Sequence, residues 1–407
     1  MGKRIEAFSL PTVMVVSVLI SLLVLFAMSL ANLENQAYHL YHARKQHILD
    51  LHSAVERYCV DSVMFYGRED TVSVRLFDTS SSPVILAKKD WGLFEVVTAR
   101  SEYLPFSYTV LCGKSRETEL DAALWICDKH RPLSLSGDTR IDGPVYIPQS
   151  GINYTEFSGR SFAGNPVEYS NIGISSATLP AIDSSSLNSI LRYRDCISRA
   201  WYFMNSPHEY VSHSDSTVFV YGKTPDHVYH LGGNQVLFGD RLTISAGSWL
   251  DGILIVARTI TLEDGFRGSG QFICTDSLLI GNHVHLSAPS GVFASGHEHP
   301  YISIGRQSQI DGYVVVLNEG KEDKDLRYPC LLQQKNSQIS GLVYVDGAAI
   351  LEGKIYGSTF LGDCYTQVDG RKYPGVLKDV QFTYDANVTY PKLLNGPYRR
   401  REIRKTY

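Results

Sequence analysis

The stretch Leu-Thr-Ile-Ser-Ala-Gly at positions 242–247 returns in altered form along the C-terminal half of the chain. Its successors are Ile-Thr-Leu-Glu-Asp-Gly (260–265), Leu-Leu-Ile-Gly-Asn-His (278–283) and Ile-Ser-Ile-Gly-Arg-Gln (302–307). Ile244, Leu262 and Ile280 are 18 residues apart, and Ile304 follows after 24. A period of this size is typical of one coil in a stack of short strands.

Each coil offers two or three inward aliphatic side chains, which cannot bury themselves alone. Stacking coils about 4.8 Å apart creates a continuous apolar column. Glycines keep the same order after the repeats and predict corners that need positive φ or close backbone approach: Gly252, Gly270, Gly291 and Gly312. We therefore expect a parallel β-helix (β-solenoid) over 226–375, with extra loop residues at 288–300. An antiparallel sandwich is the alternative interpretation of short strands and glycines.

Composition agrees with a mainly β, multidomain globular protein. The chain has 407 residues, of which 44% are hydrophobic and 20% charged, and its 33 Gly, 25 Tyr and 16 Phe favour strands and turns over helices. Net charge is −4, which gives no field that attracts nucleic acid, so we predict no nucleic-acid partner. The seven cysteines form no CxxC pair, which excludes a zinc ribbon and a dense disulfide scaffold.

The N-terminus predicts a transmembrane helix over 10–33. No residue from Leu10 to Leu33 is charged, and a helix of this length spans the roughly 30 Å hydrocarbon core, so the lipid bilayer is an expected partner. Lys3 and Arg4 precede the span, which leaves residues 1–9 as a cytoplasmic leader and places the bulk of the protein across the membrane. The alternative is a cleavable secretory signal ending at Ala31.

Helical periodicity continues past the apolar span and predicts an amphipathic helix over 34–59. Apolar residues recur there at steps of three and four: Ala37, Tyr41, Ile48, Leu51, Val55 and Tyr58.

Residues 7–16, Ala-Phe-Ser-Leu-Pro-Thr-Val-Met-Val-Val, resemble the prepilin cleavage and methylation signal of type IV pilins and pseudopilins. The resemblance covers about the first 60 residues. It implies that Ala7 precedes the cut, that Phe8 becomes the N-methylated first residue, and that the protein is a single-pass inner (cytoplasmic) membrane protein with a periplasmic or extracellular body. Thr12 stands where the family carries a glutamate that neutralises a neighbour's terminal amine during assembly. This departure indicates a minor or tip-like subunit; a plain anchor that never enters a filament is the alternative.

The remaining segments are less regular. Short runs of β-branched and aromatic residues predict a small β-sheet domain over 60–132, packed on the amphipathic helix. Residues 133–225 predict a β-rich region with a helical insertion near 187–204, and 376–407 predict a solvated C-terminal tail with a basic run that can touch anionic lipid or an acidic partner. The repeats from 240 to 362 resemble bactofilins and related polymer-forming β-helix domains. That resemblance implies assembly through protein partners or self-association.

Two sets of side chains are candidates for a metal site or a catalytic site. His283, His285, His297 and His299 are candidate metal ligands, although polar loop histidines without a metal fit the same pattern, and we predict neither metal nor cofactor. Asp251, Asp264, Asp276 and Asp311 suit either an acidic catalytic face or turns. Without a catalytic motif, we expect a membrane-anchored structural or assembly protein of a bacterial cell envelope and no enzyme. The alternative is a membrane-tethered or secreted β-helix protein that cleaves or binds glycans.

Overall fold

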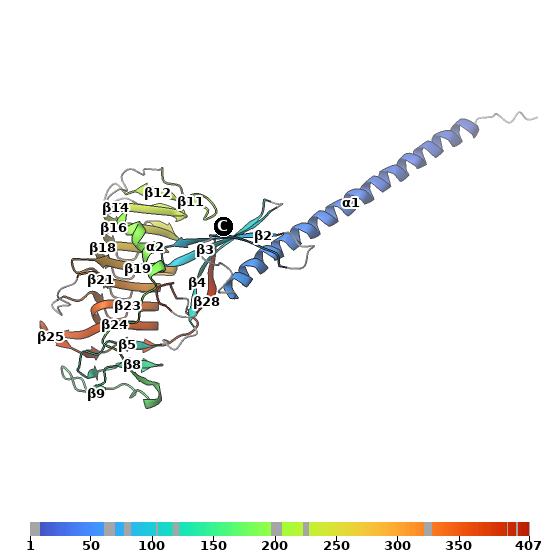
Figure 1. The fold of residues 1–407 in the computed structure, drawn as a ribbon. Helices are drawn as coiled ribbons and strands as arrows, with labels where there is room; N and C mark the ends of the chain where they lie inside the picture. The colour runs from blue at the N-terminus through green and yellow to red at the C-terminus, as the bar shows by residue number, and fades with distance from the viewer. Residues whose placement is uncertain are drawn as a thin grey trace, which may run out of the picture.

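The computed structural model shows a long helix, a small antiparallel sheet and a barrel-like sheet of parallel strands (Figure 1). The mainly β class and the long N-terminal apolar helix are confirmed. The structure describes residues 9–60, 70–76, 83–102, 105–116, 122–196, 206–222, 228–320, 328–388, 390–395 and 398–406.

Helix α1 (Ser9–Val60) is one unbroken helix of 52 residues whose N-terminal part extends away from the rest of the molecule (Figure 1). Leu51, Val55 and Tyr58 are buried near its end, at the spacing that places them on one face. In the preceding turns the apolar positions of the expected amphipathic helix are not covered, and Tyr41 is 64% and Ile48 46% exposed. The sheet that covers the helix reaches its final turns and leaves the earlier ones bare.

The small sheet lies between α1 and the barrel. One face packs on the end of α1 through Val97 and Val110, whereas the other places Trp91 and Phe94 against Phe238 and other barrel residues. Its strands follow the order β1 (Thr71–Val74), β2 (Val84–Trp91), β3 (Phe94–Ser101), β4 (Ser107–Arg116) and β28 (Tyr398–Thr406).

The barrel strands are rich in Ile, Leu, Val and Thr, as strands buried on both faces are. They are β5 (Leu124–Ile126), β7 (Arg140–Asp142), β8 (Val145–Ile147), β10 (Ile172–Ile174), β12 (Val218–Tyr221), β14 (Gln235–Ile244), β16 (Ile253–Leu262), β17 (Arg267–Gly268), β18 (Gly270–Ile280), β19 (His285–Gly296), β20 (Tyr301–Ile304), β21 (Gln309–Asn318), β22 (Leu331–Gln333), β23 (Gln338–Leu351), β24 (Lys354–Val368), β25 (Arg371–Pro374) and β27 (Gln381–Thr383). Two parallel three-stranded ladders accompany them: β11 (Tyr210–Val211), β13 (His230–Gly233) and β15 (Trp249–Asp251), and β6 (Leu133–Ser136), β9 (Ile152–Tyr154) and β26 (Val376–Lys378).

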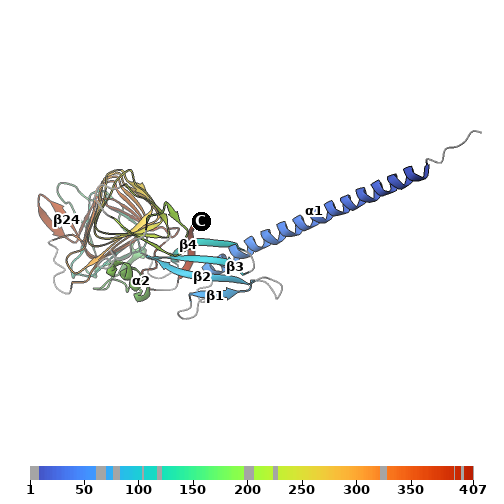
Figure 2. The same ribbon diagram turned by 90° about the horizontal axis from the view of Figure 1, so that it is seen from above.

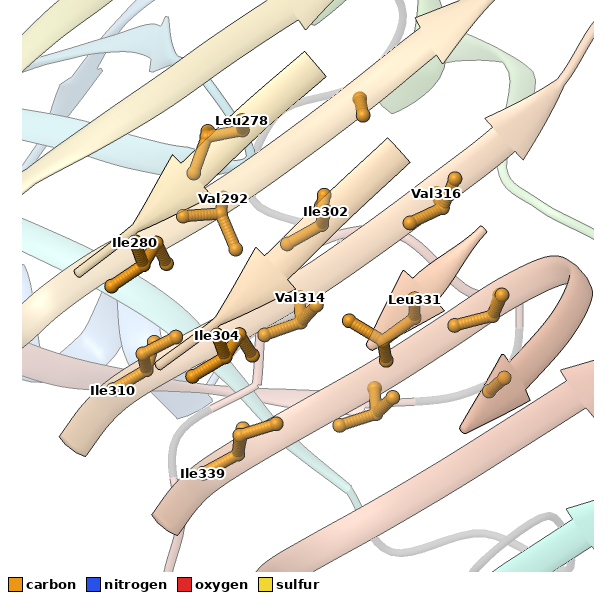
Figure 3. Close-up of a cluster of buried hydrophobic side chains, with 14 of the residues drawn as sticks. Leu278, Ile280, Val292, Ile302, Ile304, Ile310, Val314, Val316, Leu331 and Ile339 are labelled. Atoms are coloured by element: carbon orange, nitrogen blue, oxygen red, sulfur yellow. The ribbon is translucent and has the colours of Figure 1, made fainter. Parts of the chain in front are cut away.

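The register confirms the period found in the sequence. Ile244 pairs with Leu262, Leu262 with Ile280 and Ile280 with Ile304, all in parallel strands and all buried. Figure 3 shows part of this column, with Ile280 and Ile304 one above the other inside the sheet. Seen from above in Figure 2, the strands overlie one another around a closed outline. The side chains inside that outline form one continuous hydrophobic core.

The long strands contribute to two neighbouring ladders. In β18, Phe272 pairs with Val292 of β19, whereas Ile280 pairs with Ile304 of β20. Residues 288–296, part of the range 288–300 expected to hold extra loop residues, instead belong to β19, which pairs with β18 and β21. The strands therefore stay paired across the 24-residue interval from Ile280 to Ile304.

The chain does not enter the barrel at one end and leave it at the other. Phe360 of β24 pairs with Trp125 of β5, and β5 pairs in turn with β8, so early strands lie directly below late ones (Figure 1). The expected divisions at 60–132, 133–225 and 226–375 are corrected accordingly, because β5, β7, β8, β10 and β12 all belong to the parallel sheet. These strands are short and lack the repeat, so their sequence gives no sign of the partner.

The C-terminal segment 376–407 was expected to be a solvated tail, and the structure contradicts this. Strands β26 and β27 continue the parallel ladders, and β28 pairs antiparallel with β4 along most of its length. Arg400, within the basic run, has a side chain only 8% exposed. Arg400 and Arg404 of this run pair with Glu95 and Asp251, which are far away in the sequence.

The predicted helical insertion is present with different bounds. Helix α2 (Ser184–Asp195) begins at its N-cap Asp183, whose carboxylate accepts a hydrogen bond from the Ser186 amide. Its residue Ile190 packs into the apolar layer between the barrel and the small sheet. Part of the expected range, 197–204, lies outside the described residues.

Glycines mark a sharp corner in the barrel. Gly312, Gly341 and Gly357 follow one another in register with φ values of 155°, 150° and 130°. Gly291, also expected at a corner, does not have positive φ; it lies within β19, where a Cβ atom would come 2.3 Å from the ring of Tyr313. The absence of a side chain at Gly291 makes room for the ring of Tyr313.

Candidate functional site

The N-terminal half of α1 carries an apolar surface that nothing in the described structure covers. The helix is long and apolar enough to span a membrane, and none of its most apolar stretch is buried. Leu23 and Phe26, near the middle of the span, are 69% and 67% exposed. Exposed apolar patches of this extent are typical of surfaces that contact lipid or other proteins.

The residues expected to act in processing and assembly lie at the start of this helix. Thr12 is exposed in the first turn of α1. Ala7 and Phe8 lie outside the described residues. Further along, the Ser17 hydroxyl donates to the Met14 carbonyl oxygen and the Ser21 hydroxyl to the Ser17 carbonyl oxygen, which hides two polar groups within the helix itself.

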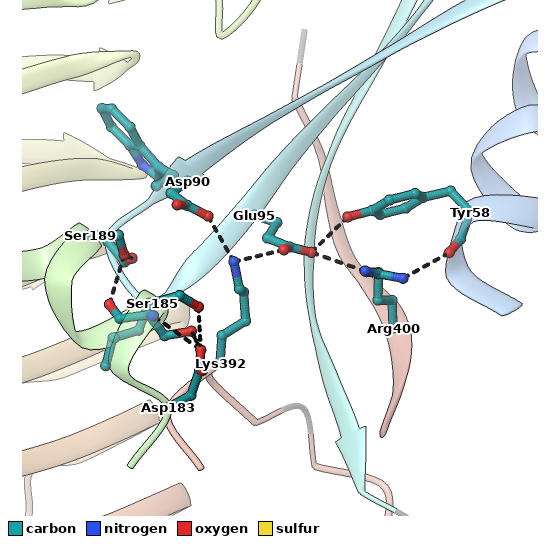
Figure 4. A network of polar contacts seen from close by, with 12 residues as sticks. Tyr58, Asp90, Glu95, Asp183, Ser185, Ser189, Lys392 and Arg400 are labelled. Carbon is teal, nitrogen blue, oxygen red and sulfur yellow. Dashed lines mark hydrogen bonds and ion pairs between the residues drawn. The ribbon is translucent and has the colours of Figure 1, made fainter. Parts of the chain in front are cut away.

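A polar network joins α1, the small sheet and the C-terminal segment (Figure 4). Glu95 accepts a hydrogen bond of 2.8 Å from the Tyr58 hydroxyl, and its carboxylate lies 2.7 Å from Lys392 Nζ and 3.2 Å from Arg400 Nε. Lys392 Nζ also lies 2.7 Å from Asp90. These groups tie three parts of the chain together at one buried point.

The charges in this network set the pKa of its carboxylate. Burial alone raises the pKa of Glu95, but the positive charges of Lys392 and Arg400 outweigh it and lower that pKa to about 2. Burial lowers the pKa of Lys392, and the carboxylates of Glu95 and Asp90 reverse the effect and raise it above its usual value. Each charge is therefore stabilised by the others, and loss of one leaves a buried charge without compensation.

The four candidate histidines do not converge. His285 lies 3.6 Å from Asp311, His297 lies 3.5 Å from Glu319, and the ring of His299 lies near that of Tyr328. His283 occupies a turn with φ of 58°. Among the described residues, no three His, Cys, Asp or Glu side chains form a group suited to a metal ion.

The four aspartates do not converge either. Asp251 pairs with Arg404 of β28, and Asp264 accepts a 2.7 Å hydrogen bond from the amide of Asn282 in the next turn. Asp276 lies 3.6 Å from Arg258, and Asp311 accepts a hydrogen bond from the Gln309 amide group. The partners come from the next turn for Asp264, from the neighbouring strand β16 for Asp276, from the same strand for Asp311 and from the distant strand β28 for Asp251.

One cleft of about 470 Å³ lies near the C-terminal end of α2. Arg194 of α2 pairs with Glu319 and donates to the Ser295 hydroxyl, and Arg258 pairs with Asp240 at 2.9 Å. The cleft is lined by Arg194, Arg258, Thr275, Asp276, Ser295, Gly296, His297, Glu298 and Glu319. Glu319 and Asp276 each face an arginine within this cleft.

Sequence reasoning missed the network around Glu95. Its members are separated by up to 342 positions, and none belongs to a motif. The basic run at the C-terminus was the one available signal, and nothing in the sequence indicated its acidic partner. Comparison of the chain with protein-family models, with curated proteins and with solved structures finds no match.

Proposed function

We propose that this protein is a membrane-anchored structural subunit of a bacterial cell envelope, similar to a minor pilin or pseudopilin, with a β-solenoid body across the membrane. The observation that carries the proposal is the bare apolar surface of α1. Burying one Leu, Val or Phe side chain stabilises by roughly 1.5–3 kcal/mol, so leaving this whole surface in water is very unfavourable. A lipid bilayer offers the cover that the rest of the chain does not.

The polar middle of α1 supports a role in spacing. Residues 34–50 continue the helix between the apolar span and the first turn that packs on the sheet, a length of about 25 Å at the usual rise per residue. In the proposed arrangement this segment holds the body away from the membrane surface. The surface around Tyr38 and Tyr41 then remains accessible to neighbouring subunits.

The solenoid interpretation is supported by the register of the parallel ladders. Successive strands repeat the same bends, and the chain returns one strand lower each time, as in the step from Leu262 to Ile280. Strand β10 lies at one end of the stack and, within the described residues, pairs along one edge with β8. Ile174 in β10 is 70% exposed. An open strand edge is a template for adding a strand from another chain, which is the route proposed for assembly.

Membrane association depends on the apolar span in this proposal. Leu19→Arg together with Leu23→Arg adds two charges near the centre of the span, each costing about 2.5–3.5 kcal/mol there. We expect the unaltered chain to stay in membranes after an alkaline carbonate wash and the double variant to be released. Leu49→Arg, on an exposed position of the same helix beyond the span, is the control and stays in the membrane. Recovery of the unaltered chain in the soluble fraction contradicts the proposal.

Processing at the N-terminus separates the pilin-like route from its alternatives. We expect mass spectrometry of protein purified from a host with a prepilin peptidase to find a chain that starts at N-methylated Phe8. A start at Asn32 shows removal of a secretory signal, and a start at Met1 or Gly2 shows a plain anchor. Either result removes the pilin-like part of the proposal, and the second leaves membrane anchoring intact.

A further inference from the structure

Two cysteines meet where α1 packs on the small sheet. Cys59 lies in the last turn of α1 and is half-buried, and Cys112 lies in β4 and is 1% exposed. Both belong to the apolar cluster between helix and sheet, and their thiol groups are joined by a hydrogen bond. The two thiols therefore lie close to each other, which is the first requirement for a disulfide.

The surroundings give the two thiols different reactivity. The hydrogen bond from Cys112 lowers the pKa of Cys59 and outweighs burial and the nearby charge of Glu402, which both raise it; the charge of Arg400 also lowers it. The same hydrogen bond and burial raise the pKa of Cys112. Cys59 is thus the accessible thiol that more readily becomes a thiolate, and thiolates are the attacking species in disulfide exchange.

The other cysteines occupy different settings. Cys274 and Cys364 are fully buried in the barrel core, where burial raises the pKa of each thiol and slows its reaction. Cys196 is exposed beside the end of α2 and serves as an internal reference for a reactive surface thiol.

We propose that Cys59 and Cys112 form a disulfide that ties the end of α1 to β4, made by exchange with a protein or small-molecule disulfide. The Cys59 thiolate attacks one donor sulfur, the donor S–S bond breaks, and the other donor sulfur leaves as a thiolate. Cys112, after losing its proton, attacks the Cys59 sulfur of the mixed disulfide and releases the second donor thiolate. The two protein thiols lose two electrons and two protons, and the donor disulfide is reduced to two thiols.

The position of this bond gives it a mechanical role. It joins the helix that bears the apolar span directly to the central part of the small sheet, across the apolar cluster rather than through β1, β2 and β3. Pulling or bending at the membrane is then transmitted to the body through a covalent link. Formation of the bond in cells rests on the proposed function, which places the body in an oxidising compartment.

The test uses the full chain purified in detergent micelles and equilibrated with oxidised or reduced glutathione. After oxidation, we expect alkylation measured in denaturant, where the buried Cys112 becomes accessible, to fall at least tenfold for both Cys59 and Cys112, and one cross-linked peptide containing both residues to appear. Cys112→Ser is expected to leave Cys59 as a mixed disulfide with glutathione, and the control Cys196→Ser to form the pair as the unaltered chain does. If Cys59 and Cys112 stay open to alkylation while Cys196 takes up glutathione, or if either pairs with another cysteine, the proposal is overturned.

Even if Cys112→Ser fails to fold, the unaltered chain tests the proposed disulfide, because the cross-linked peptide containing Cys59 and Cys112 is detected without any variant. A second arm traps thiols in intact cells with acid before alkylation. Oxidation in both arms supports the proposal. A pair that oxidises in micelles but stays reduced in cells overturns the location across the membrane and keeps the chemistry, whereas a pair that stays reduced in micelles overturns the disulfide wherever the protein resides.

Discussion

Replacing Gly341 by alanine is expected to destabilise the barrel-like sheet by about 4 kcal/mol or more, enough to unfold many domains. A Cβ atom at this position would lie 1.6 Å from the carbonyl oxygen of Gly312, and the backbone has φ of 150°, which L-residues rarely adopt. The contact is with backbone of the adjacent strand, so no side-chain rotation relieves it. Urea unfolding followed by tryptophan fluorescence and circular dichroism measures the loss.

The matched control is Gly247→Ala, in a turn where nothing lies within 4 Å of the added atom. We expect it to change the free energy of unfolding by no more than about 0.5 kcal/mol. Gly357→Ala should behave like Gly341→Ala, because its Cβ atom would lie 2.1 Å from the Gly341 carbonyl oxygen. Equal unfolding midpoints for the Gly341 and Gly247 variants are incompatible with the stacked corner.

Glu95→Gln is expected to cost about 3–5 kcal/mol and to loosen the junction between helix, sheet and C-terminus. The amide keeps the shape of the side chain but removes the charge that compensates Lys392 and Arg400, which are themselves nearly buried. Urea unfolding at pH 7 measures the change. Glu56→Gln, an exposed position on α1, is the control and should be close to neutral.

The same carboxylate gives this junction a pH dependence. Its pKa falls from the ordinary 4.5 to about 2 on folding, so its contribution, about 3 kcal/mol, is complete above pH 4.5 and is lost as the pH falls toward 2. The unaltered chain should therefore lose stability over this interval more steeply than Glu95→Gln, and the two unfolding free energies should approach each other near pH 2. A constant difference between them from pH 7 to pH 2 contradicts the charge network.

The parts of the fold that sequence could predict depend on local periodicity. The column from Ile244 to Ile304 was predictable because each coil repeats the same inward positions, and parallel register places equal positions above one another. The apolar span of α1 was predictable because the hydropathy of a segment depends only on its own residues and not on which other segment it contacts. By contrast, the pairing of Trp125 with Phe360 depends on which strand edge remains open after the other coils have stacked, and no short stretch of sequence encodes that.

Charged and titratable residues misled the sequence interpretation in two ways: ion pairs that form were missed, and a cluster that does not form was considered. The C-terminal arginines suggested a solvated tail, yet Arg400 and Arg404 reach Glu95 and Asp251, 305 and 153 positions away. The histidines near 283–299 suggested convergence, yet each meets a different neighbour. Ionic partners are set by the tertiary arrangement, which for long-range pairs leaves no periodic trace in the sequence.

The pairing of β28 with β4 has a consequence for how the protein is made. Residues 398–406 are translated after the other four strands of the small sheet, so the sheet that packs on the end of α1 stays incomplete until β28 has been made. In the proposed arrangement, the apolar span of α1 is made well before β28 and can enter the bilayer before the body is able to hold it. A nascent chain truncated before β28 should then reach the membrane with an unfinished junction between helix and sheet.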